Sequence, residues 1–288
     1  MIIQWLIDPF AFFAVPKPLP PRPKSYLKPS VFWGIRQGFP VWLSILLIAT
    51  ALGLPLLAWT IASLSQWVPT MFLPTPLTVL LSGIQMFRDE DLMRDILASC
   101  GRVLLGFLAA ALVGIPIGIL MGTFSSMERL FIPIVGTVRY MPVAAFVPLI
   151  ILWAGLEELS KVVIIFMGIV FFNALMIADA VKFIPSEMLN VAYTLGAKRH
   201  QVLMRVIFPA VMPSIIDTLR VNVAGAWNYL VISELVGADR GLGFRIVQAQ
   251  RFVQTDKVLF SIIVIGAIGL LTDYLFKLLA KMITPWAE

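Results

Sequence analysis

The chemistry that this sequence can support is limited by its few reactive side chains. Its 288 residues include one histidine, His200, and one cysteine, Cys100. One cysteine cannot form an intrachain disulfide, and the sequence has no Cys/His cluster that could build a zinc site. A Ser–His–Asp triad would have to use His200, which follows Arg199 and has no acid after it until Asp217. We therefore expect no catalytic residue and no bound metal.

Motifs that hold nucleotides or activate water are also absent from the sequence. It contains no G-x-x-x-x-G-K-[ST] loop for nucleotide phosphates, no G-x-S-x-G elbow and no H-E-x-x-H helix. We therefore expect that the chain binds no cofactor and is not an enzyme.

Basic side chains gather in one segment between two long apolar runs, NVAYTLGAKRHQVLMRVIFP at 190–209. Gly196 allows the left-handed conformation that ends one short helix and lets another begin. The apolar residues that would form ridges on these helices are Val191, Leu195, Val202, Leu203 and Val206. Such a pair of amphipathic helices fits a groove on another protein. The alternative is a helix that lies flat on the anionic cytoplasmic leaflet.

Polar and aromatic residues inside the apolar runs form a second set. In lipid each polar group needs a partner or water. Arg139 suits the attraction of an anion, although a salt bridge to a neighbouring helix fits it equally well. Single polar residues such as Asn173 more often hold helices together. The candidates for a substrate path are Arg139, Tyr140, Asn173, Asn222, Trp227, Asn228 and Glu234.

The elements that must position these residues are membrane helices. The chain is 60% hydrophobic and 13% charged, with a mean hydropathy of +0.94, whereas soluble domains average about 25% charged residues. Six runs are long enough to cross about 30 Å of hydrocarbon. They lie near 41–64, 96–122, 133–154, 161–181, 211–236 and 258–280. The sequence therefore predicts an all-α, polytopic transmembrane helix bundle in contact with lipid. Basic cytoplasmic loops account for its net positive charge, so we expect no nucleic acid as partner.

Three local patterns predict how these helices are built. Pro142 and Pro148 follow Arg139 in the third run and should loosen that helix, as in the discontinuous helices of transporters. Asp217 and Arg220 share a helix face and are expected to pair. A stripe of small residues in the second run predicts close packing against another helix, with a pore-lining role as the alternative. The stripe is Gly106, Ala110, Gly114, Gly118 and Gly122.

The loops between the runs divide into a basic and an acidic side. The basic side holds the N-terminal segment, the 190–209 segment and the C-terminal tail, so both termini are expected in the cytoplasm. Residues 1–15 are apolar but too short to cross, and 16–29 contain six prolines, which predict an extended tether. We therefore divide the chain into residues 1–40, an apolar segment with a Pro-rich cytoplasmic tether, and a membrane domain at 41–288.

The 190–209 segment resembles the cytoplasmic EAA loop of ABC-importer permeases. The match lies at Ala192, Gly196 and Pro209, whereas Asn190 stands where the loop usually has Glu. The stretches RYMPVAAFVPLIILWAGLEELSK at 139–161 and ISELVGADRGLGFRI at 232–246 look like the nitrate/sulfonate/taurine-type permeases of that class. The resemblance covers roughly 70–285, nearly the whole chain apart from the tether.

The resemblance implies a type I ABC-importer permease with a coupling loop near 182–209. ATP and Mg²⁺ would then be bound by separate ATPase subunits, and the membrane would be the bacterial inner membrane. A second permease chain, identical by expectation, and an extracytoplasmic binding protein would complete the assembly. The solute would be a small anion such as nitrate, bicarbonate, taurine or another sulfonate. The loop residues concerned are Asn190, Ala192, Leu195, Gly196, Ala197, Lys198, Arg199, His200, Val202, Arg205 and Pro209.

Three alternatives stay open from the sequence. A permease of the same architecture could carry a different small solute. A secondary transporter or channel would work without an ATPase and would place its coupling groups inside the membrane. An intramembrane enzyme would need a convergent catalytic constellation, which the sequence does not offer.

Overall fold

The computed structural model describes residues 40–287. The predicted apolar segment at 1–15 and the tether at 16–29 lie outside these residues. The chain divides into two compact units, Met1–Leu57 and Ala58–Glu288. The first helix begins in the first unit and ends in the second, and every other helix belongs to the second unit.

The part of the chain that the structure describes is helical and contains no strand, which confirms the predicted all-α fold. The α-helices are α1 (Val41–Leu64), α2 (Pro76–Asp89), α3 (Leu92–Thr123), α4 (Ser125–Val138), α5 (Val143–Ala154), α6 (Glu158–Lys182), α7 (Ser186–Thr194), α8 (Arg199–Val202), α9 (Phe208–Leu235), α10 (Leu242–Arg251) and α11 (Thr255–Ile283). A π-helical segment, η4 (Leu203–Ile207), joins α8 to α9, and a short 3₁₀ turn, η5 (Pro285–Ala287), follows α11.

Five of the described helices are long and apolar enough to cross a membrane, and the bent pair α4–α5 makes a sixth if it is one span. The third predicted run, 133–154, is therefore not one helix. It is broken at 139–142, and its two halves meet at 98°. Pro142 explains the position of the break, because proline lacks an N–H and disfavours helical geometry at the residue before it. The short helices α2 and α10 were not predicted.

The second unit is built around the contact between α3 and α6. A Cβ placed on Gly106 would lie 2.7 Å from Cβ of Ile165, and one on Gly118 would lie 2.7 Å from the carbonyl oxygen of Ala174. Only residues without a side chain let the two helices approach this closely. The predicted packing role of the small-residue stripe is therefore confirmed, and the stripe faces α6 and not a pore.

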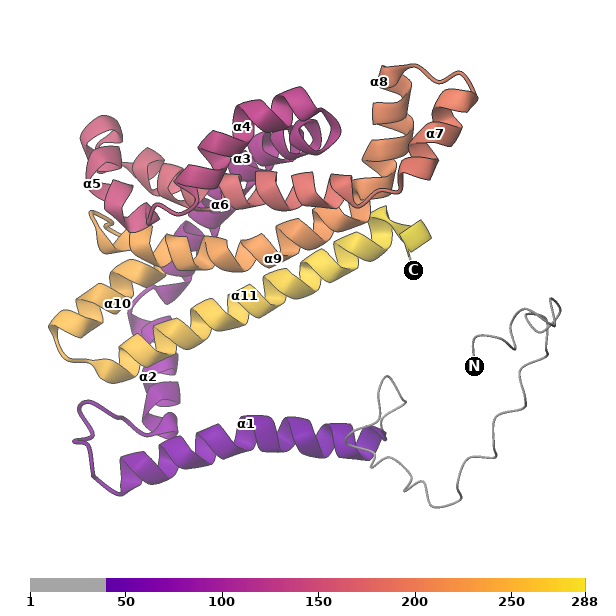
Figure 1. The fold of residues 1–288 in the computed structure, drawn as a ribbon. Helices are drawn as coiled ribbons and strands as arrows, with labels where there is room; N and C mark the ends of the chain where they lie inside the picture. The colour runs from indigo at the N-terminus through magenta and orange to yellow at the C-terminus, as the bar shows by residue number, and fades with distance from the viewer. Residues whose placement is uncertain (1–39, 288) are drawn as a thin grey trace, which may run out of the picture. The chain divides into compact units, whose positions relative to one another are not determined.

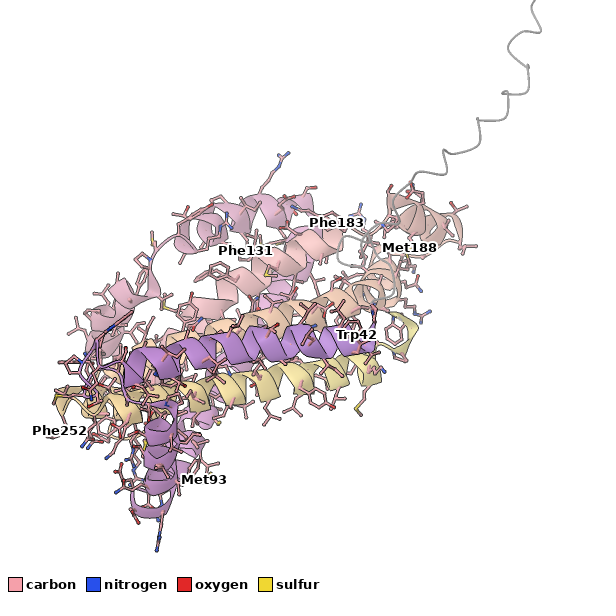
Figure 2. All side chains as sticks on the ribbon, turned by 90° about the horizontal axis from the view of Figure 1, so that it is seen from below. Trp42, Met93, Phe131, Phe183, Met188 and Phe252 are labelled. Carbon is pink, nitrogen blue, oxygen red and sulfur yellow. The ribbon has the colours of Figure 1, made fainter. Side chains whose placement is uncertain are left out.

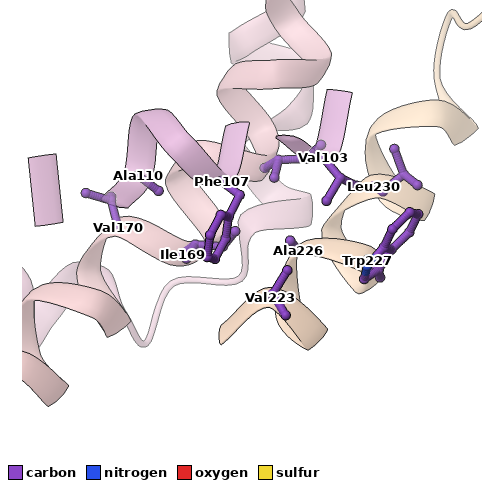
Figure 3. Packing of buried hydrophobic residues seen from close by; sticks show 10 residues of the cluster. Val103, Phe107, Ala110, Ile169, Val170, Val223, Ala226, Trp227 and Leu230 are labelled. Carbon is purple, nitrogen blue, oxygen red and sulfur yellow. The ribbon is translucent and has the colours of Figure 1, made fainter. Parts of the chain in front are cut away.

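Buried side chains from α3, α6 and α9 fill the centre of this unit (Figure 3). Phe107 comes from α3, Ile169 from α6, and Ala226 and Leu230 from α9. Helix α11 runs beside α9 (Figure 1). Since lipid is as apolar as these side chains, close packing rather than exclusion of water holds the helices together.

The two ends of the second unit carry different elements. Helices α7 and α8 stand at the end where α6 finishes and α9 begins (Figure 1). The labelled side chains of Phe183 and Met188 lie at that end, whereas Met93 and Phe252 lie at the other (Figure 2). The predicted coupling loop and the ends of the helices α2 and α10 are therefore on opposite sides of the bundle.

Candidate coupling loop and substrate path

The turn at Gly196 has the geometry that its sequence predicts. Gly196 is left-handed, with a φ of +81°. The N–H of Gly196 donates to the carbonyl of Tyr193 at 2.9 Å, and the N–H of Ala197 donates to that of Ala192 at 3.0 Å. These two bonds are the pair of a Schellman motif, in which glycine at the left-handed position ends a helix. Gly196 thus terminates α7 and turns the chain toward α8.

The segment after the turn enters the membrane helix without a break. The side-chain oxygen of Gln201 accepts from the N–H of Lys198 at 2.8 Å at the start of α8. The N–H of Phe208 donates five residues back, to the carbonyl of Leu203, in the π segment η4. This wider turn lies directly before Pro209, whose ring would crowd a regular helix at the carbonyl four residues back. Arg199–Leu235 therefore forms one long helical element.

The loop side chains divide into an inner and an outer set. Val202 is only 2% exposed and packs with Ile177 of α6 and Ile207, while Ala192 and Ala197 pack partly against the same cluster. The prediction that Val202 offers a ridge to another protein is therefore wrong, because its helix face turns to the bundle.

The outer set forms an apolar surface with a basic border. We call Met188, Val191 and Leu195 the outer loop face, since their spacing puts them on one side of α7. All three are exposed, and Leu195 is 82% exposed. Sequence reasoning found Val191 and Leu195 but missed Met188, which lies one helical turn before Val191. The polar residues that the sequence predicts for the loop are all exposed, namely Asn190, Lys198, Arg199, His200 and Arg205.

Arg139 lies at the break between α4 and α5. Its Nη2 donates to the hydroxyl of Tyr140 at 2.7 Å, and its guanidinium lies 4.5 Å from the centre of that ring. Its Nε is buried and has no hydrogen-bond partner among the described residues. No described carboxylate lies within 4.0 Å of the guanidinium, so the predicted alternative of a salt bridge to a neighbouring helix is not seen there. Arg139 therefore offers free N–H groups.

Two hollows run from Arg139 along α6 and α9. The first has a volume of about 270 Å³ and is lined by Arg139 and Tyr140. The second has a volume of about 190 Å³ and is lined by Asn222. The residues that line both are Gly168, Phe172 and Tyr229. We call the first the Arg139 hollow and the second the Asn222 hollow.

The two predicted asparagines of the path form a pair. Nδ2 of Asn222 donates to Oδ1 of Asn173 at 2.6 Å. Asn173 is fully buried, and its own Nδ2 has no partner among the described residues. Asn222 is partly exposed and lies at the Asn222 hollow. Asn228 is exposed on α9 and lines neither hollow. Tyr229, which belongs to the same polar-aromatic run of the sequence but is not among the predicted path residues, lines both.

Two other predicted path residues lie inside the protein. Trp227 is 6% exposed and belongs to the core of α3, α6 and α9, and the described residues offer its Nε1 no hydrogen-bond acceptor. Glu234 is 1% exposed. Its carboxylate accepts from Nη1 of Arg102 at 2.6 Å, from Oγ of Ser99 at 2.8 Å and from the N–H of Gly243 at 2.7 Å. Neither residue lines a hollow in this structure.

Arg102 is a buried arginine at the centre of an ion cluster that sequence reasoning missed. Besides Glu234, it binds Glu158 through two bonds, of 2.6 Å and 2.7 Å, and so ties α3 to α6, α9 and α10. An arginine within an apolar run was the signal that could have revealed it.

The predicted pair of Asp217 and Arg220 is present at 3.6 Å, but Arg220 lies closer to Asp273 of α11, at 2.6 Å. Among residues 40–287, no cluster of His, Cys, Asp or Glu could hold a metal ion. The ion pair of Arg220 with Asp273 therefore joins α9 to α11.

Comparison with known proteins matches residues 114–285 to the model of the binding-protein-dependent transport system inner membrane component family. The taurine transport system permease protein TauC of Escherichia coli K12 is 38% identical, over 79% of this chain and 84% of that protein. The putative aliphatic sulfonates transport permease protein SsuC of Bacillus subtilis 168 is 36% identical, over 76% and 79%. A chain of the inward-facing MetNI methionine ABC transporter has the same fold, with a TM-score of 0.62 at 18% identity, over 68% of this chain and 99% of that one.

Proposed function

Because this chain belongs to the family of binding-protein-dependent inner membrane transport components, we propose that it forms the path of an ATP-driven importer for a small organic anion. The relatives TauC and SsuC are named for taurine and aliphatic sulfonates. Taurine and the sulfonates share one chemical group, the sulfonate, which carries its charge on three oxygen atoms. The proposed solute is therefore a small sulfonate.

The observation that carries this proposal is the unpaired guanidinium of Arg139. A charge inside a membrane protein needs a counter-charge or water, because its transfer into an apolar medium is costly. Arg139 has a buried Nε without a partner and no described carboxylate within 4.0 Å. A guanidinium presents parallel N–H groups that match two oxygens of one oxyanion. A sulfonate in the Arg139 hollow supplies the missing charge.

The energy for transport comes from a separate subunit in this proposal. The sequence has no loop for nucleotide phosphates, so ATP and Mg²⁺ belong to an ATPase that docks on the outer loop face. Apolar side chains there enter a groove of the ATPase, and the basic residues around Lys198 and Arg199 set its orientation.

The rest of the assembly follows from symmetry and topology. Two ATPase subunits that close on nucleotide need two loops, and one loop per chain calls for a second copy of this chain related by a two-fold axis. A binding protein delivers the solute to the acid-rich loops on the opposite side of the inner membrane. Both termini are placed in the cytoplasm. Nucleotide binding and release then rock the helices between outward and inward access.

The test compares Arg139→Ala and Arg139→Lys with wild type in liposomes that hold the permease, its ATPase and its binding protein. The measurement is ATP-driven uptake of taurine and of an alkyl sulfonate. Loss of charge-assisted hydrogen bonds worth about 1.5–3 kcal/mol lowers uptake by Arg139→Ala about 10- to 150-fold. Arg139→Lys retains part of the uptake, since the charge remains.

The matched control is Arg129→Ala, which removes an exposed arginine from the same helix, α4. Its uptake and the melting temperatures of all variants should stay near wild type. Normal uptake by a stable Arg139→Ala variant would refute the role of Arg139. Uptake by wild type that continues without ATP would instead support a secondary transporter and overturn the ATP-driven proposal.

A further inference from the structure

Tyr229 separates the Arg139 hollow from the Asn222 hollow, and we propose that its ring is the movable partition that controls passage between them. Tyr229 lines both hollows. This inference rests on the proposed function, because it takes the two hollows as successive parts of one solute path.

The first support for the partition is the contact between Tyr229 and Gly168. A Cβ placed on Gly168 of α6 would lie 2.5 Å from Cε2 of the Tyr229 ring. The ring therefore occupies the space that any side chain at 168 would fill. Glycine at this position lets the ring lie against the α6 backbone and close the space between the hollows.

The second support is the room beside the ring along α9. Gly225 lies one helical turn before Tyr229 on α9 and shares that face. A Cβ on Gly225 would lie 3.9 Å from Cε2 of Tyr229, which is an ordinary contact distance. The ring thus lies beside two glycines, neither of which adds side-chain bulk next to its Cε2 edge.

Phe172 is the other aromatic residue at both hollows, and it is a weaker candidate. It is 37% exposed, so its ring lies at the rim. Tyr229 is more buried, and its ring is the one that contacts Gly168. Removal of Tyr229 would therefore join the two hollows, whereas removal of Phe172 would widen their common edge.

The position of the Tyr229 ring sets the order in which a solute would meet Arg139, Tyr229 and Asn222. Tyr229 and Asn222 are seven residues apart on α9, which corresponds to about 10 Å along the helix axis. A sulfonate bound at Arg139 must pass Tyr229 to reach the amide of Asn222. The Tyr229 hydroxyl can donate a hydrogen bond to a sulfonate oxygen as the ring turns, because a tyrosine ring carries one polar tip on an apolar body.

The main experiment measures how fast a thiol reagent passes Tyr229 and does not depend on solute transport. In a Cys100→Ser background, Asn222→Cys places a thiol in the Asn222 hollow of the assembled permease–ATPase complex in liposomes. A membrane-impermeant thiol reagent, methanethiosulfonate ethylsulfonate, is added from the side of the binding protein. We expect slow labelling with Tyr229 or Tyr229→Phe and severalfold faster labelling with Tyr229→Ala. Equal labelling rates in all three proteins would overturn the proposal.

Two further variants test the geometry. Gly168→Ala pushes the ring off α6 and should speed labelling in the same direction as Tyr229→Ala. Gly136→Ala adds a methyl group where no heavy atom lies within 4 Å and should leave the rate unchanged. A Gly168→Ala protein that assembles and labels as slowly as wild type would overturn the proposed ring position. If that variant fails to assemble, the Tyr229→Ala rate still decides.

The outcome separates the partition from the proposed function. Faster labelling in Tyr229→Ala together with absent sulfonate uptake by wild type would leave the partition standing and overturn the sulfonate proposal. Unchanged labelling together with normal ATP-driven sulfonate uptake would do the reverse. In a working transporter, we also expect Tyr229→Ala to leak preloaded taurine without ATP, and Tyr229→Phe to stay tight.

Discussion

Replacing Gly196 by valine tests whether the turn of the loop couples ATP hydrolysis by the proposed ATPase to movement of the membrane helices. Gly196 has a φ of +81°, a conformation that a β-branched residue strongly disfavours. A Cβ at this position would have no heavy atom within 4 Å. Valine therefore meets no clash with the rest of the protein, and its whole effect comes from the backbone of the turn.

The size of this effect follows from the strain. A non-glycine residue held in the left-handed region costs about 1–3 kcal/mol, which disfavours the present turn about 5- to 150-fold. If the turn relaxes, the bond from Ala197 to the carbonyl of Ala192 is lost. The direction of α7 relative to α8 then changes, and Val191 and Leu195 no longer present one surface with Arg199. The proposed ATPase could then still bind the loop, but its conformational change would no longer be passed on to α9.

The assay measures ATP hydrolysis and solute uptake together in liposomes with the ATPase and binding protein. We expect Gly196→Val to lower the uptake per ATP by about fivefold or more. Gly196→Asn should keep most of the coupling, because asparagine tolerates the left-handed region. Gly136→Val is the control for adding a valine at an open helical glycine. A stable Gly196→Val protein with wild-type uptake per ATP would show that this reasoning is wrong.

Two further predictions concern the bundle. Gly118→Val should prevent close packing of α3 on α6, because its Cβ would lie 2.7 Å from the carbonyl oxygen of Ala174. The control is Gly101→Val, whose Cβ would meet no heavy atom within 4 Å. We expect a lower melting temperature in detergent for Gly118→Val than for Gly101→Val, and equal values would contradict the packing argument. Arg102→Met should destabilise the protein by about 3–5 kcal/mol, since it leaves the buried carboxylate of Glu234 without its cation. Adding Glu234→Gln should recover part of the lost melting temperature, and an unchanged value for Arg102→Met alone would contradict the role of the cluster.

The predictions that succeeded from sequence depend on local chemistry. The length and apolar content of the runs predicted the helices long enough to span a membrane. In lipid, a helix is one of the few structures that hydrogen-bonds all of its backbone N–H and C=O groups. The small-residue stripe predicted close packing, and Gly196 predicted a left-handed turn, which its φ of +81° confirms. In each case the residues involved lie within a few turns of one helix or one loop.

The features that sequence could not supply depend on residues far apart in the chain. The prolines near 142 predicted a loosened helix, but the 98° bend depends on what packs against each half. Arg102 binds an acid 56 residues away and another 132 residues away, so no local pattern reveals the cluster. Val202 was expected to face another protein but packs against the helices of its own chain. An apolar pattern shows that a side chain is covered, but not whether this chain or a partner covers it.

In the proposed function, one helical element carries both the loop that docks the ATPase and the Tyr229 ring between the two hollows. Arg199–Leu235 runs from the loop past Tyr229, and Val202 and Tyr229 are 27 positions apart, which corresponds to about 40 Å along the helix path. Val202, directly before the π segment, and Ile207, the last residue of that segment, pack in the same buried cluster as Ile177 of α6. In the proposed function, a movement of the loop reaches Tyr229 only if η4, which joins α8 to α9, keeps its shape. A π-helical turn that narrowed to a regular one would take up the movement, so the proposal requires η4 to stay widened while the ATPase works. Pro209 favours this, because a regular turn would bring its ring against the carbonyl of Arg205.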